Sequence, residues 1–162
     1  MRSKQEKVVT GARIAALLIL IAGFPASVAF AQQPQEQSDV YKAKAMLLRA
    51  PIALKVDKDA ALRKFTAGED GFRDRDIYHY CFTLKDGVVV TGQTRGNDIR
   101  TLKDSTGKDF GLEIFDAAQK LEGEVTEIRY LAPRPGADRT PVAKVSFVTR
   151  VGELGCGVGY YP

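Results

Sequence analysis

The stretch Ile77 to Leu84 reads IYHYCFTL, and Lys85-Asp86-Gly87 and Val88 to Thr91 (VVVT) follow it directly. Aromatic and β-branched residues at this density are typical of β-strands. A short Asp-Gly connection between two such runs is typical of a hairpin turn. We therefore predict that a β-hairpin organises the fold.

Outward from this hairpin, the chain divides into a helical N-terminal part and a strand-rich C-terminal part. Apolar residues recur at helical spacing from Val40, with Pro51 expected to kink or divide that helix. Shorter helices are predicted after Asp59, which could cap one of them, and over residues 112–121. Three strands complete the pattern: 125–131, 142–151 and 156–161. Short turns between strands favour antiparallel pairing, so we predict one α+β domain over residues 40–162 with helices covering the sheet.

The first 31 residues have the pattern of a secretory signal peptide. Four basic residues and one acidic residue precede the charge-free run IAALLILIAGF, which extends from Ile14 to Phe24. The small-residue sequence Ala29-Phe30-Ala31 follows, which predicts cleavage near Ala31 and a periplasmic or secreted protein. The alternative is an uncleaved anchor helix, since the whole charge-free stretch from Ile14 to Ala31, 18 residues, is just long enough to span a bilayer. Residues 32–39 (QQPQEQSD) are polar and are interpreted as a flexible leader.

Net charge and residue types restrict the function classes. The 162 residues carry a formal net charge of +4, but +3 of this belongs to residues 1–31, so we predict no nucleic-acid partner. The chain has a single histidine, His79, and no recognisable nucleophile constellation, so we predict no enzyme activity and no cofactor. The acidic residues from Asp70 to Asp76 lack the spacing of an EF-hand, and we predict no metal site. Gly155, Gly157 and Gly159 precede no helix and are interpreted as close packing in a final strand.

Cys81 and Cys156 are the two cysteines of the chain. An exported protein permits a disulfide between them, and only one pairing exists. The alternative is a pair of buried thiols that act as small hydrophobic side chains.

Five short motifs, in order, resemble those of the single Cache sensor domains of bacteria. They are Gly71-Phe72 with Asp76-Ile77-Tyr78, Asp86-Gly87-Val88-Val89-Val90, Asp104 with Gly107-Lys108, Lys144-Val145-Ser146-Phe147-Val148, and Gly157-Val158-Gly159-Tyr160-Tyr161. The resemblance extends from about Ala43 to Tyr161. It implies a PAS-like five-stranded antiparallel sheet with a long N-terminal helix along one side and short covering helices.

In that fold the first and last strands are neighbours, which would bring Cys81 close to Cys156. The resemblance also implies that a small ligand, such as a short carboxylate or an amino acid, binds in a pocket against the sheet. The sequence departs from the family where Gly92-Gln93 replaces a frequent His-Pro and where Tyr130 replaces a frequent Trp.

Six residues are candidates for contact with an anionic or zwitterionic ligand: Tyr78, Tyr80, Tyr130, Lys144, Arg73 and Arg100. Alternation in the first strand places Tyr78 and Tyr80 on one face and His79 on the other, beside Cys81. Phenol groups can donate hydrogen bonds, and Lys144 would supply a fixed positive charge within an otherwise uncharged strand. Arginine suits carboxylates through its two-pronged donor geometry. The alternatives are core packing for the tyrosines, a snorkelling role for the lysine and surface positions for the arginines.

We therefore predict an exported small-molecule-binding sensor domain of a signal-transduction or chemotaxis type, acting without a transmembrane output module of its own. Its predicted partners are the ligand, a membrane receptor or kinase, and a second copy bound through the N-terminal helix. The alternative is a ligand-free protein-interaction module that docks on such a receptor or kinase.

Overall fold

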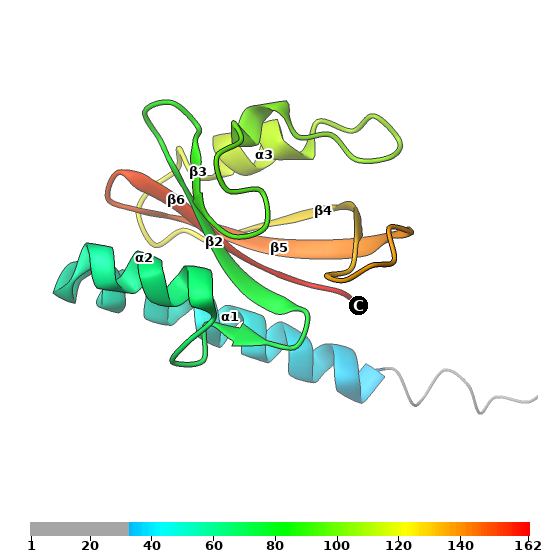
Figure 1. Cartoon of the computed structure of the whole chain (residues 1–162), viewed down its shortest axis with the longest axis horizontal. Helices are drawn as coiled ribbons and strands as arrows, with labels where there is room; N and C mark the ends of the chain where they lie inside the picture. Colours follow the sequence, from blue (N-terminus) through cyan, green and yellow to red (C-terminus); the bar gives the residue numbers. More distant parts are fainter. Residues whose placement is uncertain (1–32) are drawn as a thin grey trace, which may run out of the picture.

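A computed structural model describes residues 33–162, and the predicted signal peptide lies outside this part. Two helices, α1 (Gln33–Val56) and α2 (Lys58–Ala67), lie on one side of an antiparallel sheet, and a shorter helix, α3 (Phe110–Ala117), lies on the other (Figure 1). The strands are β1 (Arg73–Asp74), β2 (Ile77–Thr83), β3 (Val89–Thr91), β4 (Thr126–Pro133), β5 (Pro141–Val151) and β6 (Leu154–Tyr160). A single 3₁₀ turn, η1 (Ile99–Thr101), precedes α3. The predicted α+β class is confirmed.

The sheet follows the order β1-β2-β6-β5-β4. Strand β3 pairs with Cys81 and Phe82 in the C-terminal half of β2. All pairs are antiparallel, and the last strand lies in the middle of the sheet beside the first long one. The expected neighbourhood of the first and last strands is thereby confirmed. The sheet has six strands instead of five, because the two-residue β1 pairs with Ile77 and Tyr78.

The N-terminal helices differ in detail from the sequence-based prediction. The interpretation of residues 32–39 as a flexible leader is wrong, because α1 begins at Gln33. Pro34 occupies the first turn, where a missing N–H costs no hydrogen bond, and Gln35 donates to Asp39 one turn later at 3.0 Å. Helix α1 also continues through Pro51 without being divided. Asp57 caps α2 in place of Asp59, since its carboxylate accepts from the Ala60 amide.

The sheet separates two hydrophobic clusters. The larger one lies under α1 and α2 and includes Leu47, Phe65 and Cys81, whereas Phe82, Ile114 and Tyr130 belong to the cluster under α3. The predicted alternation along β2 is confirmed, since successive side chains enter opposite clusters. The predicted disulfide is also present: Cys81 and Cys156 are directly opposed on β2 and β6 and their sulfur atoms are bonded.

Among residues 33–162, no helix combines the length and apolar character needed to cross a membrane.

Candidate functional site

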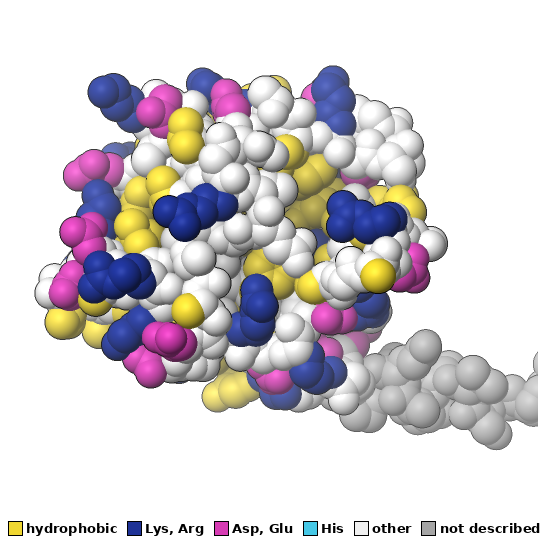
Figure 2. Space-filling model, viewed as in Figure 1, with side chains coloured by type: hydrophobic (Ala, Val, Ile, Leu, Met, Phe, Trp, Pro, Cys, Tyr) yellow, Lys and Arg dark blue, Asp and Glu magenta, His cyan; other side chains and the backbone are white. Residues whose placement is uncertain are grey.

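A cavity of about 410 Å³ lies on the α3 side of the sheet, over β2, β4 and β5. Its remaining walls come from the loop after β3, from η1 and the loop before α3, and from the β4–β5 connection. Figure 2 shows hydrophobic surface in a hollow right of centre, while basic and acidic side chains are interspersed over the rest of this face. Four of the six predicted ligand residues line the cavity: Tyr78, Tyr80, Tyr130 and Lys144.

Lys144 is the central charge of this site. Its side chain extends from β5 and is 3% exposed. The ammonium group donates a hydrogen bond to the Tyr78 hydroxyl, and it lies 4.2 Å from the centre of the Tyr78 ring and 4.9 Å from that of Tyr161. Among the described residues, no carboxylate is within ion-pair distance of it. A buried ammonium group with no counter-ion is costly, so this position is suited to an incoming anion.

Burial also changes the protonation of Lys144. Loss of hydration lowers its pKa to about 7, and the more distant Asp76 opposes this shift. The nearby rings of Tyr78 and Tyr161 favour the charged form through cation–π attraction. Lys144 is therefore poised near neutral pH between an ammonium group and a neutral amine, and an anion beside it would favour the ammonium form.

Tyrosine hydroxyls surround this lysine on the same face of the sheet. Tyr78 donates to the Gln93 amide oxygen at 3.3 Å, and the Tyr130 and Ser146 hydroxyls are 3.0 Å apart. The Tyr80 hydroxyl is fully buried and has no partner of standard geometry. Burial raises the pKa of all three tyrosines, so they stay protonated and available as donors at neutral pH.

The glycines of β6 make room for these side chains. A Cβ atom at Gly157 would lie 2.4 Å from the Tyr80 ring, and one at Gly159 would lie 2.5 Å from Cε of Lys144. Real Cβ atoms do not tolerate contacts this short. The interpretation of these glycines as close packing in a final strand is confirmed, and the residues that they accommodate line the cavity.

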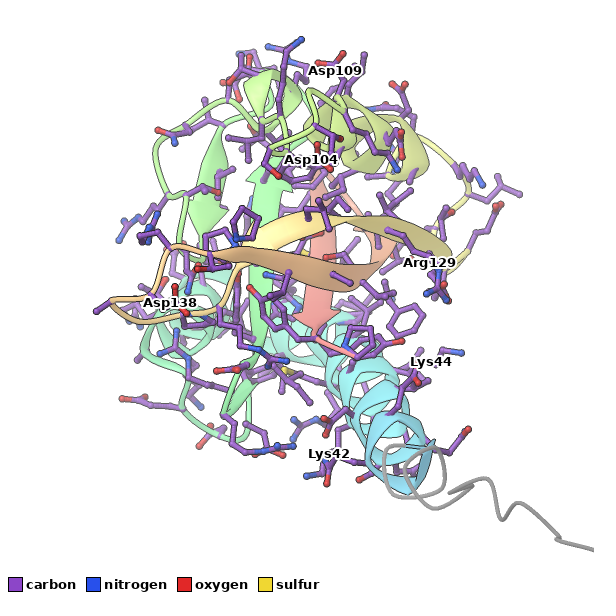
Figure 3. All side chains as sticks on the ribbon, turned by 90° about the vertical axis from the view of Figure 1, so that its right-hand side faces the viewer. Lys42, Lys44, Asp104, Asp109, Arg129 and Asp138 are labelled. Atoms are coloured by element: carbon purple, nitrogen blue, oxygen red, sulfur yellow. A yellow bond between two sulfur atoms is a disulfide. The ribbon has the colours of Figure 1, made fainter. Side chains whose placement is uncertain are left out.

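Asp104 holds the loop before α3 against β4. Its carboxylate accepts hydrogen bonds from the Thr106 amide and hydroxyl, the Lys108 amide and the Leu131 amide, at 2.6–3.2 Å. These donors, with the Thr106 hydroxyl foremost, lower the pKa of Asp104 to about 2. Figure 3 shows Asp104 between α3 and the ribbon of β4. Its four partners make Asp104 a structural anchor of the cavity wall.

Arg73 and Arg100, the other two predicted residues, do not line the cavity. Arg73 is exposed on β1, where its side chain lies against Gly68. Arg100 binds Asp98 with an N–O distance of 2.7 Å, donates to the Asp86 carbonyl and lies over the Phe115 ring. Local acidic and carbonyl groups therefore hold Arg100 at the turn after β2.

Several lining residues escaped the sequence analysis, among them Gln93, Asp104 and Arg139 as site residues. The sequence did point to Gln93, because it occupies a position where the Cache family often has proline. Arg139 belongs to an irregular hairpin connection, and no local pattern indicates that this connection covers the sheet.

His79 lies on the opposite face, near the disulfide. Its Nδ1 atom is 3.7 Å from Sγ of Cys81, and the three side chains of His79, Cys81 and Cys156 form a compact group. The sulfur atoms are bonded to each other and so offer no thiolate to a metal. The imidazole packs against Phe65 and Phe72, and burial lowers the pKa of His79 to about 3. It is a neutral core residue.

Another depression, of about 590 Å³, lies at the far end of the molecule between the β5–β6 turn and the segment after α3. Its charged lining residues are exposed or half-buried: Lys85, Lys120, Glu122, Arg150 and Glu153. Unlike the cavity around Lys144, it therefore contains no buried charge.

No protein-family model matches this chain. No curated protein matches it significantly either. Several solved structures are similar to it. One is a methyl-accepting chemotaxis protein from Vibrio parahaemolyticus RIMD 2210633, with a TM-score of 0.60 at 20% identity over 80% of this chain and 94% of that chain.

A second was described in a study of carboxylic acid recognition by a Cache chemosensory domain. It has a TM-score of 0.62 and 21% identity, over 80% of this chain and 97% of the other. A third, the periplasmic sensor domain of a chemotaxis protein, gives 0.57 and 23%, over 84% of this chain and 99% of the other. At these identities the comparisons establish architecture, and the chain has the fold of a single Cache domain.

Proposed function

We propose that this protein is an extracytoplasmic sensor domain that binds a small carboxylate in the cavity over β2, β4 and β5. The observation that carries the proposal is Lys144, a buried ammonium group that lacks a carboxylate partner among the described residues and lines the cavity. A ligand carboxylate would supply the missing charge and accept a hydrogen bond from Lys144. The cavity volume falls within the range of small-molecule sites.

The structural comparisons support this proposal. The similar structures include a methyl-accepting chemotaxis protein and the periplasmic sensor domain of a chemotaxis protein, and a third is from a study of carboxylic acid recognition by a Cache chemosensory domain. The proposed role is signal recognition, with a membrane receptor or kinase as the downstream partner. The signal-peptide pattern and the disulfide both fit a location outside the cytoplasm.

A thermal-shift screen at pH 6.5 tests the proposed function. The panel contains short mono- and dicarboxylates and amino acids, each at millimolar concentration. A ligand at one hundred times its Kd stabilises a protein by about 2.7 kcal/mol, which raises the Tm by several degrees in a domain of this size. We expect such a shift for at least one carboxylate in the wild type and in Lys120→Met, but none in Lys144→Met.

Lys120→Met is the matched control, since Lys120 is exposed and pairs with Glu124 away from the cavity. If no carboxylate or amino acid shifts the wild-type Tm, the proposed function is wrong. An equal shift in Lys144→Met would place the ligand elsewhere.

Helix α1 supports a second part of the proposal, association with a second copy. Four large apolar side chains are exposed on it: Tyr41 at 74%, Leu48 at 64%, Ile52 at 67% and Val56 at 83%. Their spacing places them on one face of the helix, over about 22 Å of its length. Two such faces could pack against each other, and the same surface would serve if the partner were instead a receptor.

A further inference from the structure

We propose that the ligand is a short dicarboxylate without an amino group, and that Arg139 binds its second carboxylate at the mouth of the cavity. This inference rests on the proposed function, since it takes Lys144 as the site of the first carboxylate. The other residues of the cavity wall determine which type of carboxylate binds there.

Four charged side chains line the cavity, and two of them, Lys103 and Asp104, interact with other groups of the protein. Lys103 forms an ion pair with Asp109 at 2.8 Å, and Asp104 accepts four hydrogen bonds from the protein. Lys144 and Arg139 also line the wall, and neither has a carboxylate within ion-pair distance among the described residues. The cavity therefore offers two cationic groups to a ligand.

The two cations lie at different depths. Lys144 is buried within β5, whereas Arg139 is exposed on the β4–β5 connection, five residues earlier in the chain. Pro135 and Gly136 of the same connection and Pro141 at the start of β5 also line the cavity, so this connection forms its rim. An extended chain advances about 3.3 Å per residue, so the two Cα atoms are at most about 17 Å apart. Because both side chains are long, the ammonium group of Lys144 and the guanidinium group of Arg139 can come closer together than their Cα atoms, to a separation that a small dianion can bridge.

Asp138, the neighbour of Arg139, does not neutralise it. The Asp138 carboxylate accepts a hydrogen bond from the Thr140 amide at 2.8 Å, which also lowers its pKa. In Figure 3, Asp138 lies on the loop at one end of β4 and β5, and Arg129 lies away from that loop. The guanidinium group of Arg139 is thus available for a two-pronged contact with a carboxylate.

The wall also disfavours a free amino acid. An ammonium group needs acceptors, and the carboxylate of Asp104 is occupied by backbone and hydroxyl donors. The Gln93 amide oxygen already accepts from Tyr78. A zwitterion would also bring its positive charge close to Lys144 and Arg139. These contacts favour succinate-like anions over amino acids of the same length.

Calorimetric titration of the wild-type protein at pH 6.5 with succinate, butyrate and aspartate tests this inference. We expect succinate to bind at least tenfold more tightly than butyrate or aspartate. Arg139→Gln should weaken succinate binding about tenfold and leave butyrate binding unchanged. Arg129→Gln is the matched control, because Arg129 is exposed, pairs with Glu127 and does not line the cavity; it should alter neither affinity.

Butyrate or aspartate binding as tightly as succinate would overturn the dicarboxylate inference and leave the proposed function standing. So would an Arg139→Gln variant with unchanged succinate affinity. If none of the three compounds binds and the wider carboxylate panel gives no thermal shift, both the inference and the proposed function are wrong.

Discussion

At the scale of single residues, we expect Lys144 to make the proposed ligand binding depend on pH. Its pKa of about 7 in the free protein means that it carries a full charge below that value and loses it above. A bound carboxylate favours the charged form, so binding above pH 7 requires the uptake of a proton. We expect the affinity for succinate to be greatest near pH 6.5, where Lys144 is charged and succinate is a dianion, and to fall by about tenfold per pH unit above pH 8.

Calorimetry across pH 5.5–9 measures this dependence directly. Titration in buffers of different ionisation enthalpy would detect the proton taken up at pH 8. An affinity that does not change between pH 6 and 9 would contradict the assignment of Lys144 as the binding charge.

His79 makes folding stability depend on pH in a different range. Its pKa is about 3 in the folded protein and near 6.5 when the chain unfolds. Between these values the unfolded state takes up a proton that the folded state cannot, so stability is complete above pH 6.5 and is lost as the pH falls. The expected loss is about 1.4 kcal/mol of unfolding free energy per pH unit.

Urea denaturation at pH 7, 6 and 5 tests this prediction, with His79→Leu as the comparison. The variant removes the titrating group and its unpaired Nε2 atom, so its stability should vary little over this range. A similar slope in both proteins would show that other groups cause the pH dependence.

At the scale of elements, the glycines of β6 connect packing to function. Alanine at Gly159 would contact the flexible end of Lys144, whereas alanine at Gly155 would contact the Phe82 ring at 2.2 Å and Ala118 within the core. We expect Gly159→Ala to fold with a small loss of Tm but to weaken carboxylate binding at least tenfold. Gly155→Ala should lower the Tm far more.

Thermal denaturation and calorimetry of the two variants separate these effects. The account of β6 would be wrong if Gly159→Ala bound succinate like the wild type.

The same elements show how far the sequence could lead. Strand alternation predicted Tyr78, Tyr80 and the face of His79, because period-two side-chain direction is a local property. The start of α1 could not be predicted from polarity, since its first turns depend on the Gln35–Asp39 contact and on Asp39 binding Arg75, 36 residues away. The position of Arg100 outside the cavity could not be predicted for a similar reason: its carboxylate partner, Asp98, is only two residues away but depends on the η1 turn to face it.

At the scale of the whole molecule, the exposed apolar face of α1, formed by Tyr41, Leu48, Ile52 and Val56, predicts a dimer. Sedimentation velocity should show a dimer for the wild type and a monomer for Leu48→Glu, because a charge in the middle of an apolar interface is costly. Leu121→Glu is the matched control, since Leu121 is 80% exposed and lies outside α1. A wild-type monomer at high micromolar concentration would contradict the prediction, as would a Leu48→Glu dimer.

In the molecule as a whole, a disulfide links the two central strands β2 and β6, and the buried Lys144 lines a cavity over the sheet. Helices α1 and α2 and the disulfide occupy one face of the sheet, so the other face is free to form the cavity (Figure 1). The disulfide and the proposed ligand site therefore lie on opposite sides of the sheet.

A crystal structure of the protein grown with saturating succinate would show directly whether Lys144 and Arg139 bind a dicarboxylate in the cavity over β2, β4 and β5. We expect one carboxylate of the ligand within hydrogen-bond distance of Lys144 Nζ and the other beside Arg139. Succinate bound outside this cavity, or a cavity that stays closed with Lys144 touching no ligand, would contradict this expectation.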